Sequence, residues 1–488
     1  MSSGLVEAFE EILQATRQAF PQLRSFEHAR RLAYGFAVVW GRRTISRALC
    51  AIQSQFEDWS ASYRFFSRSP WRPNDVFQPI LQRCLEQGEG PFPVALDDTT
   101  TKKSGKHIPG VRYLHDPMSP AFASSFMRGH RFIQASAVLR PEGLDGPARA
   151  IPVRFHPAPS AKKPGKRADD AAWAAYREAQ RSQSLSVQGA SVIADLRRSM
   201  DEAGYQHRGL LVAVDGGYCN RNVLRHLPDR VEVIARARGD VRLFRPLTAV
   251  ERMIWGRRRK YGEALPLPKD MISDDEVPWK KEKVFGAGKI HALAYKVIDR
   301  VLWRSGTRDR QLRLFVIRPL RYRPRIGARL LYRDPAYLLT TDLVSPDKTL
   351  LQAYFDRWEI EVNHRDEKDL LGVDQAQVWS PAATWRVPQF QVAVYAMLLL
   401  AALKAYGPTR TEAYLPAPKW RRQETRRPST LDILALLREE LMEQAISGFR
   451  SPARTRGKPR LDADRSSTDA TRTPAPVDPI TAALYASG

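Results

Sequence analysis

Cysteine is scarce in this chain, and its scarcity excludes two ways of stabilising a fold. Only Cys50, Cys84 and Cys219 occur among 488 residues, and no two of them have Cys-x-x-Cys spacing. An odd number of widely spaced cysteines argues against a disulfide framework and against a cysteine-based zinc site. Ordinary packing must hold the fold together, and 43% hydrophobic residues are enough for a sizeable core.

Long hydrophobic runs are also missing. The longest one, 392–403, has 12 residues, whereas a membrane-spanning helix needs about 20. The first 20 residues contain Glu7, Glu10 and Glu11 and lack the basic start and apolar centre of a secretory signal. We therefore expect a cytoplasmic protein with no membrane partner. The sequence also lacks a P-loop, a His-Glu-x-x-His zinc motif and a Gly-x-Ser-x-Gly nucleophile elbow.

Acidic residues are in the minority. Lys and Arg number 78 against 53 Asp and Glu, which gives a net charge of +25 and a pI near 10.2. Residues 241–340 alone hold 24 basic and 10 acidic side chains. The excess charge thus belongs to the body of the chain and not to a tail, and it indicates a polyanionic partner, with nucleic acid the first choice.

The N-terminal part, residues 1–88, has the periodicity of helices, seen in 5–20 and 26–40. Thr44 is a suitable N-cap for a further helix after the basic turn at 41–43. Two helices joined by a short turn fit a helix-turn-helix DNA-binding domain. A plain helical bundle with a solvated basic edge fits as well.

The pattern changes at residue 89 to an alternation of strands and helices. The expected order is β-β-β-α-β-α-β, which predicts a mixed α/β sheet with two central strands buried on both faces. The expected strands are 93–98, 132–139, 150–155, 209–215 and 231–236, and the expected helices are 171–203 and 220–227.

The remaining boundaries follow from composition. We assign 89–240 to the first part of a catalytic core, 241–344 to a basic β-rich insertion, 345–405 to the last part of the core, 406–450 to a helical C-terminal region and 451–488 to a disordered tail rich in Pro, Ser, Thr and Arg.

Acidic residues end two of the apolar strands. Asp97 and Asp98 follow the strand that begins at Pro93, and Asp215 follows the strand that begins at Gly209. Carboxylate oxygens are the protein ligands that Mg²⁺ prefers, and two such ions can assist an in-line phosphoryl displacement. A single Asp at a strand end more often serves a turn.

A third acid lies in a more specific pattern. Tyr354, Arg357, Glu361 and Lys368 have the spacing Tyr-x2-Arg-x3-Glu-x6-Lys, and on one continuous helix they form a narrow stripe. Trp358 falls on the adjoining apolar face. A carboxylate flanked by two cations suits phosphate chemistry, although a solvated helix face with i,i+4 charge pairs also explains the spacing.

With these residues in view, the chain resembles the bacterial insertion-sequence DDE transposases that carry a Tyr-Arg-Glu-Lys (YREK) signature. Three blocks carry the resemblance: 96–107, 214–218 and 354–372. The resemblance implies an RNase H-like fold with a β-rich insertion before the last acid. It also implies Mg²⁺ as cofactor with Mn²⁺ as a substitute, double-stranded DNA (transposon ends and target) as partner, a homodimer in a synaptic complex, and a nucleoid-associated location.

Residue by residue, the resemblance implies that Asp98, Asp215 and Glu361 are the catalytic metal ligands. Asp98 is preferred to Asp97 because it precedes the threonines and shares strand parity with Val94 and Leu96. The DNA contacts implied by the same matches are Tyr354, Arg357, Trp358, Lys368, Lys102, Lys103 and Lys106. For Trp358 core packing is the alternative to stacking on a displaced base, and the three early lysines fit a solvated loop equally well.

The expected function is a transposase that binds terminal inverted repeats of an insertion sequence and catalyses cut-and-paste DNA cleavage and strand transfer. A catalytically silent DNA-binding regulator derived from a transposase is the alternative. A metal-free tyrosine recombinase, suggested by His28, Arg31 and Tyr63, has less support, because a His-x-x-Arg pair arises easily in an Arg-rich chain.

Overall fold

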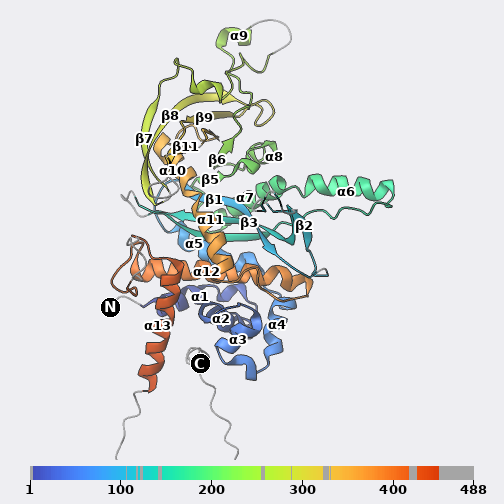
Figure 1. Cartoon of the computed structure of the whole chain (residues 1–488), viewed down its shortest axis with the longest axis vertical. Helices are drawn as coiled ribbons and strands as arrows, with labels where there is room; N and C mark the ends of the chain where they lie inside the picture. The colour runs from blue at the N-terminus through green and yellow to red at the C-terminus, as the bar shows by residue number, and fades with distance from the viewer. Residues whose placement is uncertain are drawn as a thin grey trace, which may run out of the picture.

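The computed structural model describes residues 4–105, 107–116, 119–120, 122, 125–140, 146–253, 259–286, 288–322, 329, 331–332, 334–416 and 426–449. Its central feature is one ten-stranded mixed sheet. The strands run in the order β2-β3-β1-β5-β6-β12-β9-β8-β7, and β4 pairs with the other part of β3. Figure 1 shows this sheet across the middle and top of the molecule, with helices packed below it.

The strands of the first half are those expected from the sequence, with longer ends. They are β1 (Phe92–Lys102), β2 (Arg112–His115), β3 (Phe126–Leu139), β4 (Arg149–Pro157), β5 (Leu210–Val214) and β6 (Val231–Ala237). β1 is antiparallel to β3, whereas β1, β5 and β6 are mutually parallel. The order β4-β3-β1-β5-β6, with these directions, is consistent with an RNase H-like fold. The expected mixed α/β architecture is therefore confirmed.

The insertion is β-rich as expected, but its strands do not form a lobe apart from the core. They are β7 (Lys280–Gly286), β8 (Lys289–Leu302), β9 (Gln311–Ile317) and β12 (Ala336–Thr340), with a small separate pair of β10 (Arg321–Tyr322) and β11 (Leu331–Tyr332). β12 pairs antiparallel with both β6 and β9. The insertion thus continues the core sheet through β12, which leaves β6 fully paired.

Helices cover both faces of the sheet. α5 (Pro73–Leu85) and α7 (Leu185–Glu202) pack on the face that carries Leu96 and Arg154, whereas α10 (Asp347–Asp356) and α11 (Glu359–Asp369) pack on the other. The expected helix 171–203 is divided into α6 (Asp170–Ser182) and α7, and the short α8 (Arg221–Leu224) follows β5. α9 (Ala249–Met253) lies in the insertion.

The N-terminal helices are α1 (Leu5–Ala15), α2 (Leu23–Val38), α3 (Ile45–Ala51), α4 (Trp59–Ser67) and α5. Thr44 caps α3 as predicted, because its side chain accepts a hydrogen bond from the Arg47 amide. These helices pack around α12 (Pro381–Tyr406), and α13 (Thr430–Phe449) packs against α1, α2 and α12. One continuous hydrophobic core joins all of them to the sheet.

α12 is long and apolar enough to span a membrane by length and composition. However, 89% of its most apolar window is buried inside the protein. Its neighbours include the aromatic rings of Phe36, Phe65 and Trp71, which surround Phe390. α12 therefore has the surroundings of a central core helix. The predicted disordered tail, 451–488, lies outside the described residues.

Candidate active site

Two parallel strands bring the first acids together. β1 continues to Lys102 and does not end at Asp98 as the sequence suggested. Its last residue paired with β5 is Leu96, which lies opposite Val214. The next residues along the two strands are Asp97 and Asp215, so these carboxylates lie at the same edge of the parallel pair.

Strand parity separates Asp97 from Asp98. Asp97 pairs with Gln134 of β3. Ala95, which points to the same face of β1 as Asp97, packs against Ile360 of α11. Asp98 pairs with Ile133 and shares parity with Leu96, on the opposite face. Because α11 covers the face of Ala95 and not the face of Val94 and Leu96, the parity that Asp98 shares with Val94 and Leu96 places it away from α11.

The YREK segment is not one continuous helix. α10 ends at Asp356 and α11 begins at Glu359. Between them, the Trp358 and Ile360 amides bond to carbonyls three residues back, at Phe355 and Arg357, which tightens the chain as a 3₁₀ turn does. The stripe predicted for a straight helix is consequently bent at Arg357.

Arg357 lies at this bend and joins two of the acids. Its Nη1 is 3.1 Å from Asp97 Oδ2, and its Nη2 is 3.3 Å from Glu361 Oε1. The guanidinium is largely buried, with 13% of the side chain exposed. One cation thus holds a carboxylate of β1 and the carboxylate of α11 on the same face of the sheet.

The acids perturb one another. Burial raises the pKa of Asp97 to about 7, and the neighbouring Asp98 and Asp215 contribute while Arg357 opposes the shift. Burial and Asp215 likewise raise the pKa values of Asp98 and Glu361. Carboxylates that raise each other's pKa mark a place where an added cation is favourable.

Asp98 has its own partners on the opposite face. Its Oδ2 lies 3.5 Å from Arg131 Nε, and Arg131 and the buried phenol of Tyr218 oppose the rise that burial causes in the pKa of Asp98. Neither Arg131 nor Tyr218 is a candidate from sequence reasoning. Tyr218 lies three residues after Asp215 in a block that carries the resemblance, whereas Arg131 has no local signal and is found only through the β1–β3 register.

The other members of the YREK pattern, Tyr354 and Lys368, have different neighbours. The Tyr354 phenol is close to Arg357, whose guanidinium carbon is 5.9 Å from the ring centroid, and burial raises the pKa of Tyr354. Burial lowers the pKa of Lys368, and Glu367, Asp374 and Asp369 oppose that shift. Lys368 is therefore surrounded by acids at the far end of α11.

Trp358 does not pack in the core. Its side chain is 54% exposed, so the core-packing interpretation is wrong. The bend between α10 and α11 turns this indole away from the apolar face on which a straight helix would place it. This exposed indole follows Arg357 directly in the sequence and is available to a ligand.

The early lysines have different surroundings. Lys103 Nζ donates to the carbonyl oxygens of Asp374 (2.7 Å) and Ala376 (3.3 Å), which ties β1 to the loop after α11. Lys102 is exposed and lies 3.1 Å from Asp116. Lys106 lies outside the described residues. For Lys103 the structure thus shows a positioning contact.

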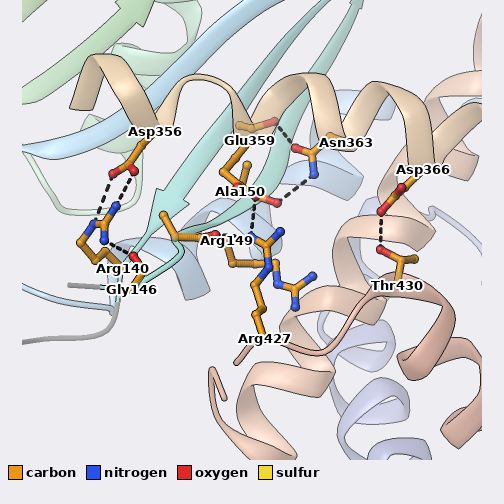
Figure 2. Close-up of polar contacts among 12 residues, drawn as sticks. Arg140, Gly146, Arg149, Ala150, Asp356, Glu359, Asn363, Asp366, Arg427 and Thr430 are labelled. Carbon is orange, nitrogen blue, oxygen red and sulfur yellow. Dashed lines mark hydrogen bonds and ion pairs between the residues drawn. The ribbon is translucent and has the colours of Figure 1, made fainter. Parts of the chain in front are cut away.

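A polar network fixes α10 and α11 from the side away from the acids. Figure 2 shows Asp356, Glu359, Asn363 and Asp366 with partners just after β3, in β4, before α13 and at the start of α13. Their partners are, in order, Arg140 (Nε–Oδ2 3.3 Å), Arg427 (2.5 Å), the Ala150 carbonyl (3.1 Å) and Thr430 (2.7 Å). Because these contacts lie on both sides of Glu361 in sequence, they set the position of its carboxylate.

The three candidate carboxylates have the chemistry that a divalent metal requires, but they are not arranged around a common point. Asp97, Asp215 and Glu361 offer only oxygen ligands, and the negative charge of Asp215 contributes to the raised pKa values of Asp97 and Glu361. Within the described part of the chain, no three His, Cys, Asp or Glu side chains are already gathered as a metal-binding group. Arg357 currently holds two of the three carboxylates, so a bound cation would compete with its guanidinium.

An RNase H-like sheet that gathers carboxylates at one edge, on a strongly basic chain, is the framework of a metal-dependent nuclease. A family model described as DDE superfamily endonuclease matches residues 18–310, which is more than half of the chain. The chain belongs to this family. The match ends before Glu361, so it does not cover the YREK segment. No curated protein matches the sequence significantly.

Proposed function

We propose that this protein is a DNA transposase that cleaves DNA at the ends of a mobile element and joins those ends to a new site. The observation that carries the proposal is the convergence of Asp97, Asp215 and Glu361 around Arg357. Family membership supports DNA as the substrate and a divalent metal as the cofactor. The net charge of +25 supports a polyanionic partner.

We assign the β1 ligand to Asp97 and give Asp98 a supporting role. Asp97 shares a face with α11 and contacts the arginine that also binds Glu361, whereas Asp98 faces Arg131. Asp98 is one residue away on the same strand, and its charge still contributes to the field at the site. This assignment changes the preference drawn from sequence and keeps Asp215 and Glu361.

Mg²⁺, with Mn²⁺ as a substitute, would be held by Asp97, Asp215 and Glu361, and when bound it activates an attacking oxygen and stabilises the leaving oxygen of a phosphodiester. Arg357 and Lys368 would neutralise the phosphates on either side of the reacting group. Tyr354 would orient a phosphate oxygen through its phenol. Trp358 would stack on an unpaired base at the cut end.

The finer features of the proposal come from the YREK resemblance. They are recognition of terminal inverted repeats of an insertion sequence, a cut-and-paste pathway and a homodimer in a synaptic complex. The N-terminal helices would contact the repeat, with α3 entering the major groove. Arg47 is exposed on α3 next to its capped end, which is consistent with such a contact.

Cleavage of a terminal-repeat duplex tests the proposal. The conservative variants Asp215→Asn and Glu361→Gln are expected to lose cleavage in Mg²⁺ by at least a thousandfold and to bind the duplex as the parent protein does. Glu412→Gln is the control, since Glu412 is exposed and lies between α12 and α13, outside the site. Cleavage retained in either site variant would contradict the site. Binding without any metal-dependent cleavage by the parent protein would favour the silent regulator.

A further inference from the structure

An arm leaves the sheet at the edge where the acids lie. Residues 158–184 connect β4 to α7 and contain α6. The arm begins next to Arg131, because the Ala158 amide donates to the Arg131 carbonyl (2.8 Å), and the Arg131 side chain contacts Asp98, the neighbour of Asp97 on β1. Figure 1 shows α6 extending outward from the body of the molecule.

α6 is amphipathic, yet none of its residues is buried. Its Asp169 N-cap accepts a hydrogen bond from the Ala172 amide, so the helix is well started. On its inner side, Trp173 and Tyr176 meet edge to face at 6.0 Å. Lys163, from the segment before the helix, lies 5.9 Å from the centroid of the Trp173 ring. The segment 158–168 therefore folds back along α6 and is held there.

This segment carries charge of one sign. It contains Lys162, Lys163, Lys166 and Arg167 and no acidic residue. All four side chains are exposed, and within the described part of the chain none of them forms an ion pair. Four cations close together repel one another, and the nearby Asp169 and Asp170 at the start of α6 form no ion pair with them. Such a surface is complementary to a polyanion.

Among polyanions, duplex DNA is the one that the endonuclease family of this chain supports, and the length of the arm is compatible with it. Thirteen residues of α6 span about 20 Å at 1.5 Å per residue, which matches roughly six base pairs with a phosphate every ~1.7 Å of axis. The arm starts next to Arg131, the partner of Asp98, and leads away from the sheet. We propose that residues 158–184 bind the phosphate backbone of the duplex that continues from the cleavage site. This inference rests on the proposed function for its position, but not for the binding itself.

The salt dependence of binding tests the arm. The variant K162Q/K163Q/K166Q/R167Q and the parent protein are titrated, without Mg²⁺, against a labelled 40-base-pair duplex of unrelated sequence. Each phosphate contact contributes about 0.9 to the slope of log K against log salt concentration. The quadruple variant removes four cations and is expected to lose about 3.6 from that slope, whereas K162R/K163R/K166R, which keeps the charge, retains it.

Equal slopes for the quadruple variant and the parent would overturn the proposal. A change in self-association, seen by sedimentation, with an unchanged slope would overturn it in favour of a second copy of the chain as occupant. Failure of the proposed function is a separate result. In that case Asp215→Asn and the parent protein are equally inactive, while the dependence of the slope on the arm persists.

Discussion

At the scale of single residues, the site depends on which of two adjacent aspartates faces α11. The chemistry of Asp97 and Asp98 is identical, and only the pleat of β1 distinguishes them. Arg357 is 3.1 Å from Asp97, and Asp98 lies 3.5 Å from Arg131 on the other face. The same substitution, Asp to Asn, is therefore expected to affect DNA cleavage differently at the two positions.

Asp97→Asn is expected to lower metal-dependent DNA cleavage by at least a thousandfold, because it removes a charged ligand from the site. Asp98→Asn is expected to lower cleavage only about tenfold, through the field at the site. Rates of nicking at fixed Mg²⁺ measure both effects, and circular dichroism verifies that both variants are folded. A larger loss in Asp98→Asn than in Asp97→Asn would reverse the assignment.

The sequence alone could nominate these two residues but not choose between them. An apolar run followed by acids predicts a strand and its end, and the strands of the core lie where the alternation placed them. The choice requires knowing which side of the sheet α11 covers, and that depends on packing between segments more than 250 residues apart. Strand parity relative to Val94 was informative only once that side was known.

At the scale of elements, α11 combines an anchored face with a buried acid. Glu367 is 1% exposed, and burial raises its pKa from about 4.5 to about 8. The nearby Gln134 presents an amide oxygen that lacks a hydrogen-bond donor, and Glu367 Oε1 lacks one too. If the Glu367 carboxyl is protonated, its O–H donates a hydrogen bond to the Gln134 amide oxygen, and both oxygens then have a partner. This hydrogen bond joins α11 to β3.

Stability is thus expected to fall as the pH rises. A carboxyl whose pKa is higher in the folded than in the unfolded protein contributes its full stabilisation below about pH 4.5 and loses it as the pH rises through about 8. Glu367→Gln, which mimics the protonated acid, is expected to be about 1–3 kcal/mol more stable than the parent protein at pH 8.5 and nearly equal to it at pH 5. Urea unfolding at the two pH values measures the difference, and Glu359→Gln is the control. A constant difference at both pH values would contradict the prediction.

The elements that sequence reasoning placed incorrectly share one physical cause. The insertion contains short strands with clear signals, such as β9, but its union with the core depends on the pairing of β12 with β6, about 100 residues earlier in the chain. The bend at Arg357 likewise appears in no local pattern, because every residue around it is compatible with a helix. In both cases tertiary pairing and packing decide the geometry, and local propensity does not.

At the scale of the whole molecule, α12 connects parts that composition would separate. The proposed N-terminal DNA-binding helices and the catalytic sheet both pack on it, in one core. Phe390 lies at the contact, 1% exposed, with its ring 5.7 Å from that of Phe66 and 6.0 Å from that of Trp71. A repeat bound by the N-terminal helices would therefore be held rigidly relative to the acids, as cleavage at a fixed distance from a recognition sequence requires.

Because the N-terminal helices and the sheet share one hydrophobic core, we expect them to unfold together. Phe390→Ala removes a ring at the centre of the contact and is expected to lower the free energy of unfolding by about 3–5 kcal/mol. The melting curve should keep a single transition. Trp379→Ala is the control, because this indole is 63% exposed, and a change within about 0.5 kcal/mol is expected for it. Calorimetry on the full chain measures both. Two separate transitions, with only the earlier one shifted by Phe390→Ala, would show that the N-terminal helices fold independently of the sheet, and the rigid coupling of recognition to cleavage would then have to come from bound DNA.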